Sequence, residues 1–387
     1  MAMNCLSILL DRGAAEGSFG YHHHCKDSKL THLYFADDLL IFCDGSLRSV
    51  KNVLQIIQNF TDVSGFAVSI SKTSFFSCGI QQPEKDRIIS ETGITHGLLP
   101  VRYLGIPLCT KKLSLANCEP LIQQIKNKVN SWSARSLSFA GRLLLINTVI
   151  AGISNFWCSI FTIPKKCIKL INSICGANLW KGTTEGHHSA RVSWETVTLS
   201  KEEGGLRIRD LHLWNKACTL KLVWLLFFRS GSIWVAWFTK HILRDCKSNF
   251  WTIKEKQSHS YAIRKLLRVR EYAYSWINIK IEDGASARFW SDNWSPFGNI
   301  REFLNITTTS ALGIRQNATL ADIRYEGGWH IPAPRSDSQL ALHTFLTTLT
   351  LSQSHDLYEW RQPGNSSQTF KTGLTYNLIK LHQTHVP

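Results

Sequence analysis

Residues 30–43 read LTHLYFADDLLIFC, and this stretch decides the fold of the N-terminal part of the chain. Two adjacent acids, Asp37 and Asp38, stand between two short runs rich in aromatic and branched apolar residues. Runs of this kind form strands and acids are common in tight turns, so the pattern predicts a β-hairpin with the acids at its turn. Because charge between buried apolar walls is costly without a partner, one interpretation of the pair is a divalent-metal site. The alternative is an ordinary polar hairpin tip.

Local signals predict a helix and a second turn after this hairpin. Ser46 is a suitable N-cap, and Gly65 is a suitable C-terminal stop for the helix between them. The apolar residues that recur at helical spacing in this segment are Val50, Val53, Leu54, Ile57 and Phe60. Lys72 lies near the end of segment 64–73, where the local interpretation is a surface lysine at a strand end. Gly105 and Pro107 fit a tight turn within 102–108.

The composition is that of a basic globular chain. Its 387 residues favour two or three domains, and its 44 Lys plus Arg against 28 Asp plus Glu give a formal charge of +16. A distributed basic surface suits a long polyanion such as nucleic acid, although an ordinary basic protein has the same composition. The longest apolar run, 222–228, is too short for the roughly 20 residues of a transmembrane helix, so we expect no membrane span.

Eleven cysteines raise the questions of zinc binding and disulfides. No pair has the two-residue gap of a zinc knuckle and no cysteine follows Cys246, so we predict no zinc site. Their odd number, without a secretory signal, predicts free thiols in a reducing intracellular compartment and no disulfides. The His-His-His-Cys run at 22–25 is either a metal-binding loop or, as we favour, a polar hairpin tip.

Further landmarks follow the hairpin in order along nearly the whole chain. They lie at 64–73, 102–108, 132–147, 181–194, 204–211, 215–237, 284–294 and 356–376. Together with Phe35-Ala36-Asp37-Asp38, these segments resemble the C-terminal part of the reverse transcriptase of plant LINE-type (non-LTR) retrotransposons. The resemblance implies an RNA-directed DNA polymerase that uses Mg²⁺ or Mn²⁺ and acts on an RNA template and a DNA primer.

The resemblance also implies roles for individual residues. Asp37 and Asp38 would be catalytic metal ligands, and Lys72 would lie near the incoming nucleotide. The residues expected to contact primer or template are Phe35, Tyr103, Leu104, Gly105 and Arg142.

The fold class implied by the resemblance is α+β. A partial polymerase palm, made of antiparallel β-hairpins plus helices, would occupy 1–112, followed by a mostly helical thumb or connection at 113–230. The small mixed C-terminal region would contain a Trp-rich basic module (231–300), a loop-rich linker (301–355) and the truncated start of a zinc-binding domain (356–387).

The sequence departs from the family in its carboxylates. A working palm also needs an aspartate on a strand upstream of the hairpin, and only Asp11 stands far enough upstream, in a stretch typical of a helix end. We therefore expect a polymerase remnant that is inactive as this chain. Two alternatives stay open, a basic nucleic-acid-binding protein without chemistry and an unstable gene product. The family implies a nuclear location or a cytoplasmic ribonucleoprotein.

Overall fold

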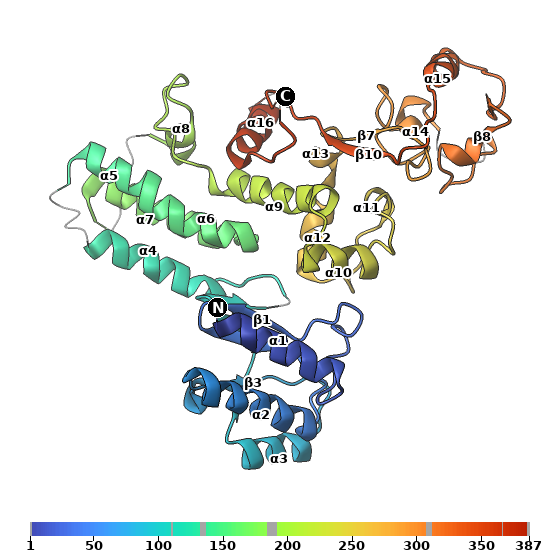
Figure 1. Cartoon of the computed structure of the whole chain (residues 1–387). Coiled ribbons are helices and arrows are strands. Elements are labelled where there is room, and N and C mark those ends of the chain that lie inside the picture. The colour runs from blue at the N-terminus through green and yellow to red at the C-terminus, as the bar shows by residue number, and fades with distance from the viewer. Residues whose placement is uncertain are drawn as a thin grey trace. The chain divides into compact units, whose positions relative to one another are not determined.

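The computed structural model describes residues 2–109, 111–131, 137–183, 192–306, 312–365 and 367–384. It divides into two compact units, Met1–Cys109 and Thr110–Pro387. Helices dominate, and the sheets in the described residues each have two strands (Figure 1). The expected α+β class is confirmed. Parts of the landmarks at 132–147, 181–194 and 356–376 lie outside the described residues.

The first unit is built on two packed helices, α1 (Ala2–Ala15) and α2 (Leu47–Ser64). The predicted ends of α2 are confirmed, because the Ser46 hydroxyl accepts from the Ser49 N–H and Gly65 follows the helix with φ 75°. The residues that form the core between α1, α2 and the preceding loop are Leu6, Leu10, Ala14, Phe19, Val53, Ile57 and Phe60. A third helix, α3 (Gln82–Thr92), packs against α2.

The strands of the first unit form three separate pairs. The hairpin β1 (His32–Phe35) with β2 (Asp38–Ile41) and the hairpin β5 (Val101–Tyr103) with β6 (Ile106–Leu108) are antiparallel. The third pair, β3 (Ser74–Phe75) with β4 (Thr95–His96), is parallel, which the expectation of antiparallel hairpins did not include.

Segment 65–73 is a loop with one short turn rather than a strand, so Lys72 is an exposed lysine, as the local interpretation had it, but it precedes a strand instead of ending one. The described backbone forms a 3-10 turn, η1 (Ile70–Lys72), before β3 begins. The Thr73 hydroxyl donates to the Ser69 carbonyl at 2.8 Å, and side chains that bond to nearby backbone in this way compete with strand pairing.

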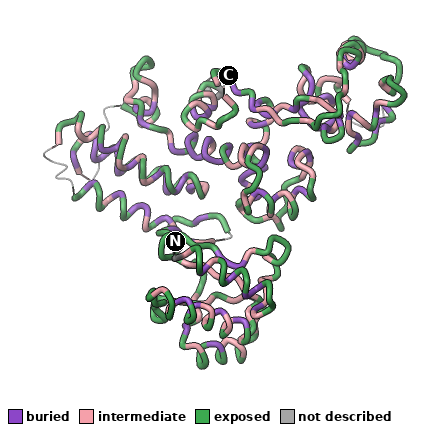
Figure 2. Tube along the Cα trace, in the orientation of Figure 1, coloured by how far each residue is buried: buried purple, intermediate pink, exposed green. Residues whose placement is uncertain are grey.

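The second unit begins with a helical bundle. Its helices are η2 (Ala116–Cys118), α4 (Glu119–Ser131), α5 (Phe139–Leu145), η3 (Ile146–Ile150), α6 (Ala151–Ile160), α7 (Lys165–Lys181), α8 (Trp194–Thr198) and α9 (Leu211–Phe228). Each bundle helix turns a buried face inward, and α6 and α7 both pack against α9 (Figure 2). Asn215 of α9 joins the bundle internally, because its amide donates to the carbonyls of Cys158 and Phe161.

Apolar helices in this bundle bear on the expectation of no membrane span. Among the described residues, the continuous helix Phe139–Ile160 is long and apolar enough to cross a membrane, and α9 with α10 (Ile233–His241) forms a second such segment bent by 80°. Core helices of soluble proteins share these properties, and α6 packs against α9 inside the unit. The absence of a membrane span stays a prediction.

The rest of the second unit mixes short helices and strand pairs. Its elements are α11 (Asn249–Thr252), α12 (Tyr261–Leu267), α13 (Arg270–Tyr274), β7 (Ile277–Lys280), α14 (Ile300–Phe303), η5 (Ala321–Ile323), β8 (Arg324–Tyr325), β9 (Gly328–Trp329), α15 (Asp337–Thr348), β10 (Leu357–Trp360) and α16 (Thr372–Thr384). β7 pairs with β10 in antiparallel register, and α16 packs on α9.

One hydrophobic core crosses the expected boundary at residue 300. It joins Phe289, Trp290 and Trp294 to Leu320 and Leu342. The segment 301–355, expected to be a loop-rich linker, thus contributes α15 and buried side chains to a packed core. The finer domain boundaries stay predictions.

Candidate functional site

The acidic hairpin has a two-residue turn. Phe35 pairs with Asp38, which leaves Ala36 and Asp37 as the turn residues. Ala36 has φ 54°, a left-handed conformation that residues with a Cβ adopt at a cost of about 1 kcal/mol or more. Positive φ at the first turn position matches the right-handed twist of hairpin strands. The predicted hairpin and the position of its acids are therefore confirmed.

The carboxylate pair is exposed, not enclosed by apolar walls. Asp37 and Asp38 are both exposed, and the neighbouring side chains of Leu33, Tyr34 and Phe35 are 41, 41 and 61% exposed. The expectation of buried walls around the acids is therefore wrong, since β1 and β2 pair only with each other in the described residues. Water can solvate both charges, so burial does not demand a metal ion here. The exposed apolar residues instead leave an open face on the hairpin.

A polar network fixes β1 against α1. The Thr31 hydroxyl donates to Asp11 Oδ1 at 2.5 Å, His32 Nε2 lies 2.8 Å from the Ser7 hydroxyl, and the Tyr34 hydroxyl donates to Asn4 at 2.9 Å. Burial lowers the pKa of His32, and the charge of Asp11 opposes that effect only in part. Sequence reasoning missed this network. Its signal was the spacing of Ser7 and Asp11, which places both on one face of a helix.

A second anchor holds the far end of the hairpin. The Asp44 N–H donates to the Gly20 carbonyl, and the Asp44 carboxylate accepts from the N–H and hydroxyl of Ser46 at 3.0 Å each. Partial burial alone would raise the pKa of Asp44, but hydrogen bonds from Ser46 and Ser49 lower it. A Cβ at Gly20 would collide with the Asp44 carboxylate, so the close approach requires glycine. Asp44, just after the hairpin, is thus tied to the loop that follows α1 and to the N-cap of α2.

The other expected site residues of the first unit lie in two separate elements, the β5–β6 hairpin and the turn η1. Tyr103 ends β5, and Leu104 and Gly105 form the two-residue turn of the β5–β6 hairpin, both with positive φ, 51° and 79°. The tight turn predicted from Gly105 and Pro107 is therefore confirmed. Lys72 is exposed in η1, and no hydrogen bond or ion pair within the described part of this unit joins it to Asp37 or Asp38.

Arg142 lies in the second unit and has a partner there. Its guanidinium is half-buried and donates to the Asn178 carbonyl of α7 at 3.3 Å, which links α5 to α7. Its expected contact with primer or template stays a prediction.

A metal site needs several ligands gathered in one place. Carboxylates are the ligands that Mg²⁺ prefers, and Asp37 and Asp38 supply two. Across the described ranges, however, no three His, Cys, Asp or Glu residues gather into a group that could hold a metal ion. The two aspartates are thus of the right chemical type but form an incomplete ligand set. The 22–25 run forms a turn, closed by the Cys25 N–H donating to the His22 carbonyl.

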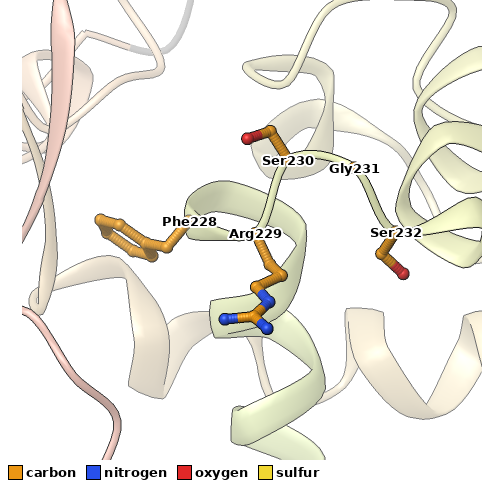
Figure 3. A pocket seen from close by; sticks show the side chains of 5 residues that line it. All are labelled: Phe228, Arg229, Ser230, Gly231 and Ser232. Carbon is orange, nitrogen blue, oxygen red and sulfur yellow. The ribbon is translucent and has the colours of Figure 1, made fainter.

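The described surface of the second unit also has hollows. One of about 570 Å³ lies at the turn between α9 and α10, lined by Phe228 to Ser232. Figure 3 shows that the side chains of Phe228, Arg229, Ser230 and Ser232 point in different directions. No set of groups converges on a single ligand position there, so this hollow is not a strong site candidate.

A family model and a plant protein each match part of the chain. Residues 8–108 match the family model described as reverse transcriptase (RNA-dependent DNA polymerase), so this segment is a reverse transcriptase family domain. It includes both hairpins and Lys72, but not Arg142. A protein of Arabidopsis thaliana named "Putative ribonuclease H protein" is 27% identical over 194 residues. The matched region is 49% of this chain and 31% of that distant plant relative.

Proposed function

We propose that the chain carries the downstream carboxylate pair and the primer-side turn of an RNA-directed DNA polymerase from a plant LINE-type (non-LTR) retrotransposon. The observation that carries the proposal is the aspartate pair at the exposed turn of β1–β2, inside a reverse transcriptase family domain. Asp37 and Asp38 are proposed as ligands of Mg²⁺ or Mn²⁺, which in this chemistry would stabilise the attacking and leaving oxygens.

The remaining residues are assigned supporting roles. We place Lys72 near the incoming nucleotide, and Phe35, Tyr103, Leu104, Gly105 and Arg142 at the primer and template. Because the described residues supply two carboxylates and no third ligand, we expect no primer extension by this polypeptide alone. We place its site of action in the nucleus or in a cytoplasmic ribonucleoprotein.

The experiment is a Mn²⁺ titration followed by NMR, with line broadening as the readout. Mn²⁺ is expected to broaden the signals of the β1–β2 turn first, and Asp37→Asn or Asp38→Asn is expected to abolish that preference. Asp62→Asn is the matched control, because Asp62 is also an exposed aspartate of the first unit and lies outside the hairpin. Broadening that spreads equally over exposed acids would contradict the proposal.

A basic nucleic-acid-binding protein is the second candidate, favoured by the net charge of +16. Its affinity for an RNA–DNA duplex should fall steeply with salt, because each neutralised phosphate releases counterions. This function does not use the carboxylates. Filter binding across a salt series should therefore give the same affinity for Asp37→Asn as for the parent chain, and a salt-independent affinity would remove this candidate.

A further inference from the structure

One face of the helix that runs through α5, η3 and α6 is left uncovered by the described bundle. The helix is continuous from Phe139 to Ile160, and its inner side is buried against α7 and α9. On the other side exposed residues recur at every fourth position, namely Ala140, Leu144, Thr148, Gly152, Phe156 and Ile160. Residues spaced by four form the ridges by which helices most often pack against one another. We call this set the 140–160 ridge.

The 140–160 ridge is low in its middle and bulky on both sides of it. Leu144 and Phe156 are 63 and 44% exposed. Thr148 and Gly152 stand between them, and a Cβ added at Gly152 would meet no group within 4 Å beyond its own helix backbone. The two bulky residues and the two small ones are placed symmetrically about position 150. A helix that crosses the ridge at its middle can therefore come close, with a large apolar side chain on either side of the crossing.

The ridge is neutral, although the chain as a whole carries a formal charge of +16. Arg142 is the single charged residue between positions 139 and 160, and its half-buried guanidinium donates to the Asn178 carbonyl. The Thr148 hydroxyl donates to the Leu144 carbonyl at 2.8 Å, so it needs no partner from outside. An apolar surface can thus cover the ridge without burying an unpaired charge. A nucleic-acid backbone does not suit it, because contacts to phosphates need lysine or arginine.

A lipid surface suits this helix less well than another helix does. The helix is long and apolar enough to cross a membrane, but its inner side packs on α7 and α9, so crossing would require the bundle to open. Helices that lie in a membrane surface carry several lysines and arginines along their polar face. Between positions 139 and 160 the helix has Arg142 alone, which is turned toward α7.

We propose that the 140–160 ridge docks a second copy of this chain, with the two helices antiparallel and the two-fold axis at the middle of the ridge. Leu144 then lies against the partner's Phe156. Thr148 lies against the partner's Gly152. A two-fold interface brings the same patch of both copies together, so a ridge that is symmetrical about its middle is complementary to itself. One helix face is smaller than the roughly 800 Å² per partner of a stable interface, so we expect weak association, in the micromolar range.

The test is sedimentation equilibrium of the whole chain, treated with nuclease, at high salt and over a range of micromolar concentrations. Salt screens the repulsion between the two basic copies, and the nuclease removes nucleic acid that could bridge them. The parent chain should show a monomer–dimer equilibrium. Leu144→Lys and Phe156→Glu should each weaken it about tenfold or more, because each places an unpaired charge in the interface.

The double variant Leu144→Lys with Phe156→Glu tests the antiparallel register. Within one chain the two positions are about 18 Å apart along the helix, so the new charges cannot pair there. In the proposed dimer the lysine of each copy faces the glutamate of the other. Association of the double variant should therefore be stronger than that of either single variant.

The matched control is Leu340→Lys, because Leu340 is an equally exposed leucine on α15, outside the ridge. It should associate like the parent chain, and all variants should keep the parental melting temperature, since the changed side chains are exposed. The proposal is overturned if the parent chain stays monomeric, if Leu144→Lys associates like the parent, or if the double variant is no stronger than the single ones. A monomeric parent that binds vesicles of neutral phosphatidylcholine, and loses this with Leu144→Lys, would assign the ridge to a lipid surface instead.

Discussion

The carboxylate of Asp11 lies 3.7 Å from Nδ1 of His32, across the junction of α1 and β1. The two side chains differ in environment, since 8% of the His32 side chain and 59% of the Asp11 side chain are exposed. Asp11, the upstream acid that we rejected on sequence grounds as a replacement for a catalytic aspartate, accepts a hydrogen bond from the Thr31 hydroxyl in this network. Its position here supports the base of the acidic hairpin.

This relationship predicts acid sensitivity of the first unit. Burial lowers the pKa of His32, so between that value and the ordinary 6.5 the unfolded chain binds more protons than the folded one. The stability due to His32 is therefore present at neutral pH and is lost as the pH falls below about 6.5. Hydrogen exchange of the α1 and β1 peptides should speed up on acidification. His32→Gln should remove most of this response, whereas His23→Gln, at an exposed position, should preserve it.

The turn of the hairpin gives a second prediction. Ala36 adopts φ 54°, where glycine has no Cβ penalty. Ala36→Gly should stabilise the first unit by about 0.5–1 kcal/mol, despite the added entropy of the unfolded chain. Ala67→Gly is the control, because Ala67 is exposed and has no positive φ. Chemical denaturation measures the free energy of unfolding of both variants. If Ala36→Gly lowers it as much as Ala67→Gly does, the assigned turn conformation is contradicted.

The sequence predicted local features of the first unit well because each depends on few neighbours. Ser46 caps the start of α2 with its own hydroxyl, Gly65 ends the helix with its own backbone N–H and positive φ, and Gly105 supports a turn by its own φ. Exposure of Phe35 was not predictable, because it depends on which strands flank β1. The packing of Phe345 against Trp294 was likewise hidden, since the two residues lie far apart in the sequence and meet only in the folded core.

Asp356 gives a prediction for the second unit. Its carboxylate accepts hydrogen bonds from the backbone N–H groups of Glu282, Gly284, Ser286 and Ala287 at 2.8–3.1 Å. Asp356→Asn replaces one acceptor oxygen with a donor that faces donors, so it should cost about 2–3 kcal/mol. Asp337→Asn, at an exposed position in the first turn of α15, should cost far less. Equal melting temperatures for the two variants would refute this role.

Asp292 predicts the opposite response to acid from that of His32. Its side chain is fully buried and accepts from the Ser248 hydroxyl at 2.6 Å and from the Arg288 N–H at 2.8 Å, while Oδ1 has no partner in the described residues. Burial raises the pKa of Asp292 to about 6, and the two hydrogen bonds offset only part of that effect. Between the ordinary value of 3.8 and about 6 the folded chain therefore binds more protons than the unfolded one.

Stability from this residue should therefore fall as the pH rises from about 4 to about 6, with a cost of about 3 kcal/mol once the carboxyl is ionised in both states. Asp292→Asn cannot ionise, so its stability should lack this component across the same range. Hydrogen exchange of β7 and the 284–294 segment, compared between the parent chain and Asp292→Asn, measures the difference directly. The parent should gain protection relative to the variant as the pH falls from 7 to 5. If their difference stays constant over that range, Asp292 is already ionised at pH 5 and the burial argument fails.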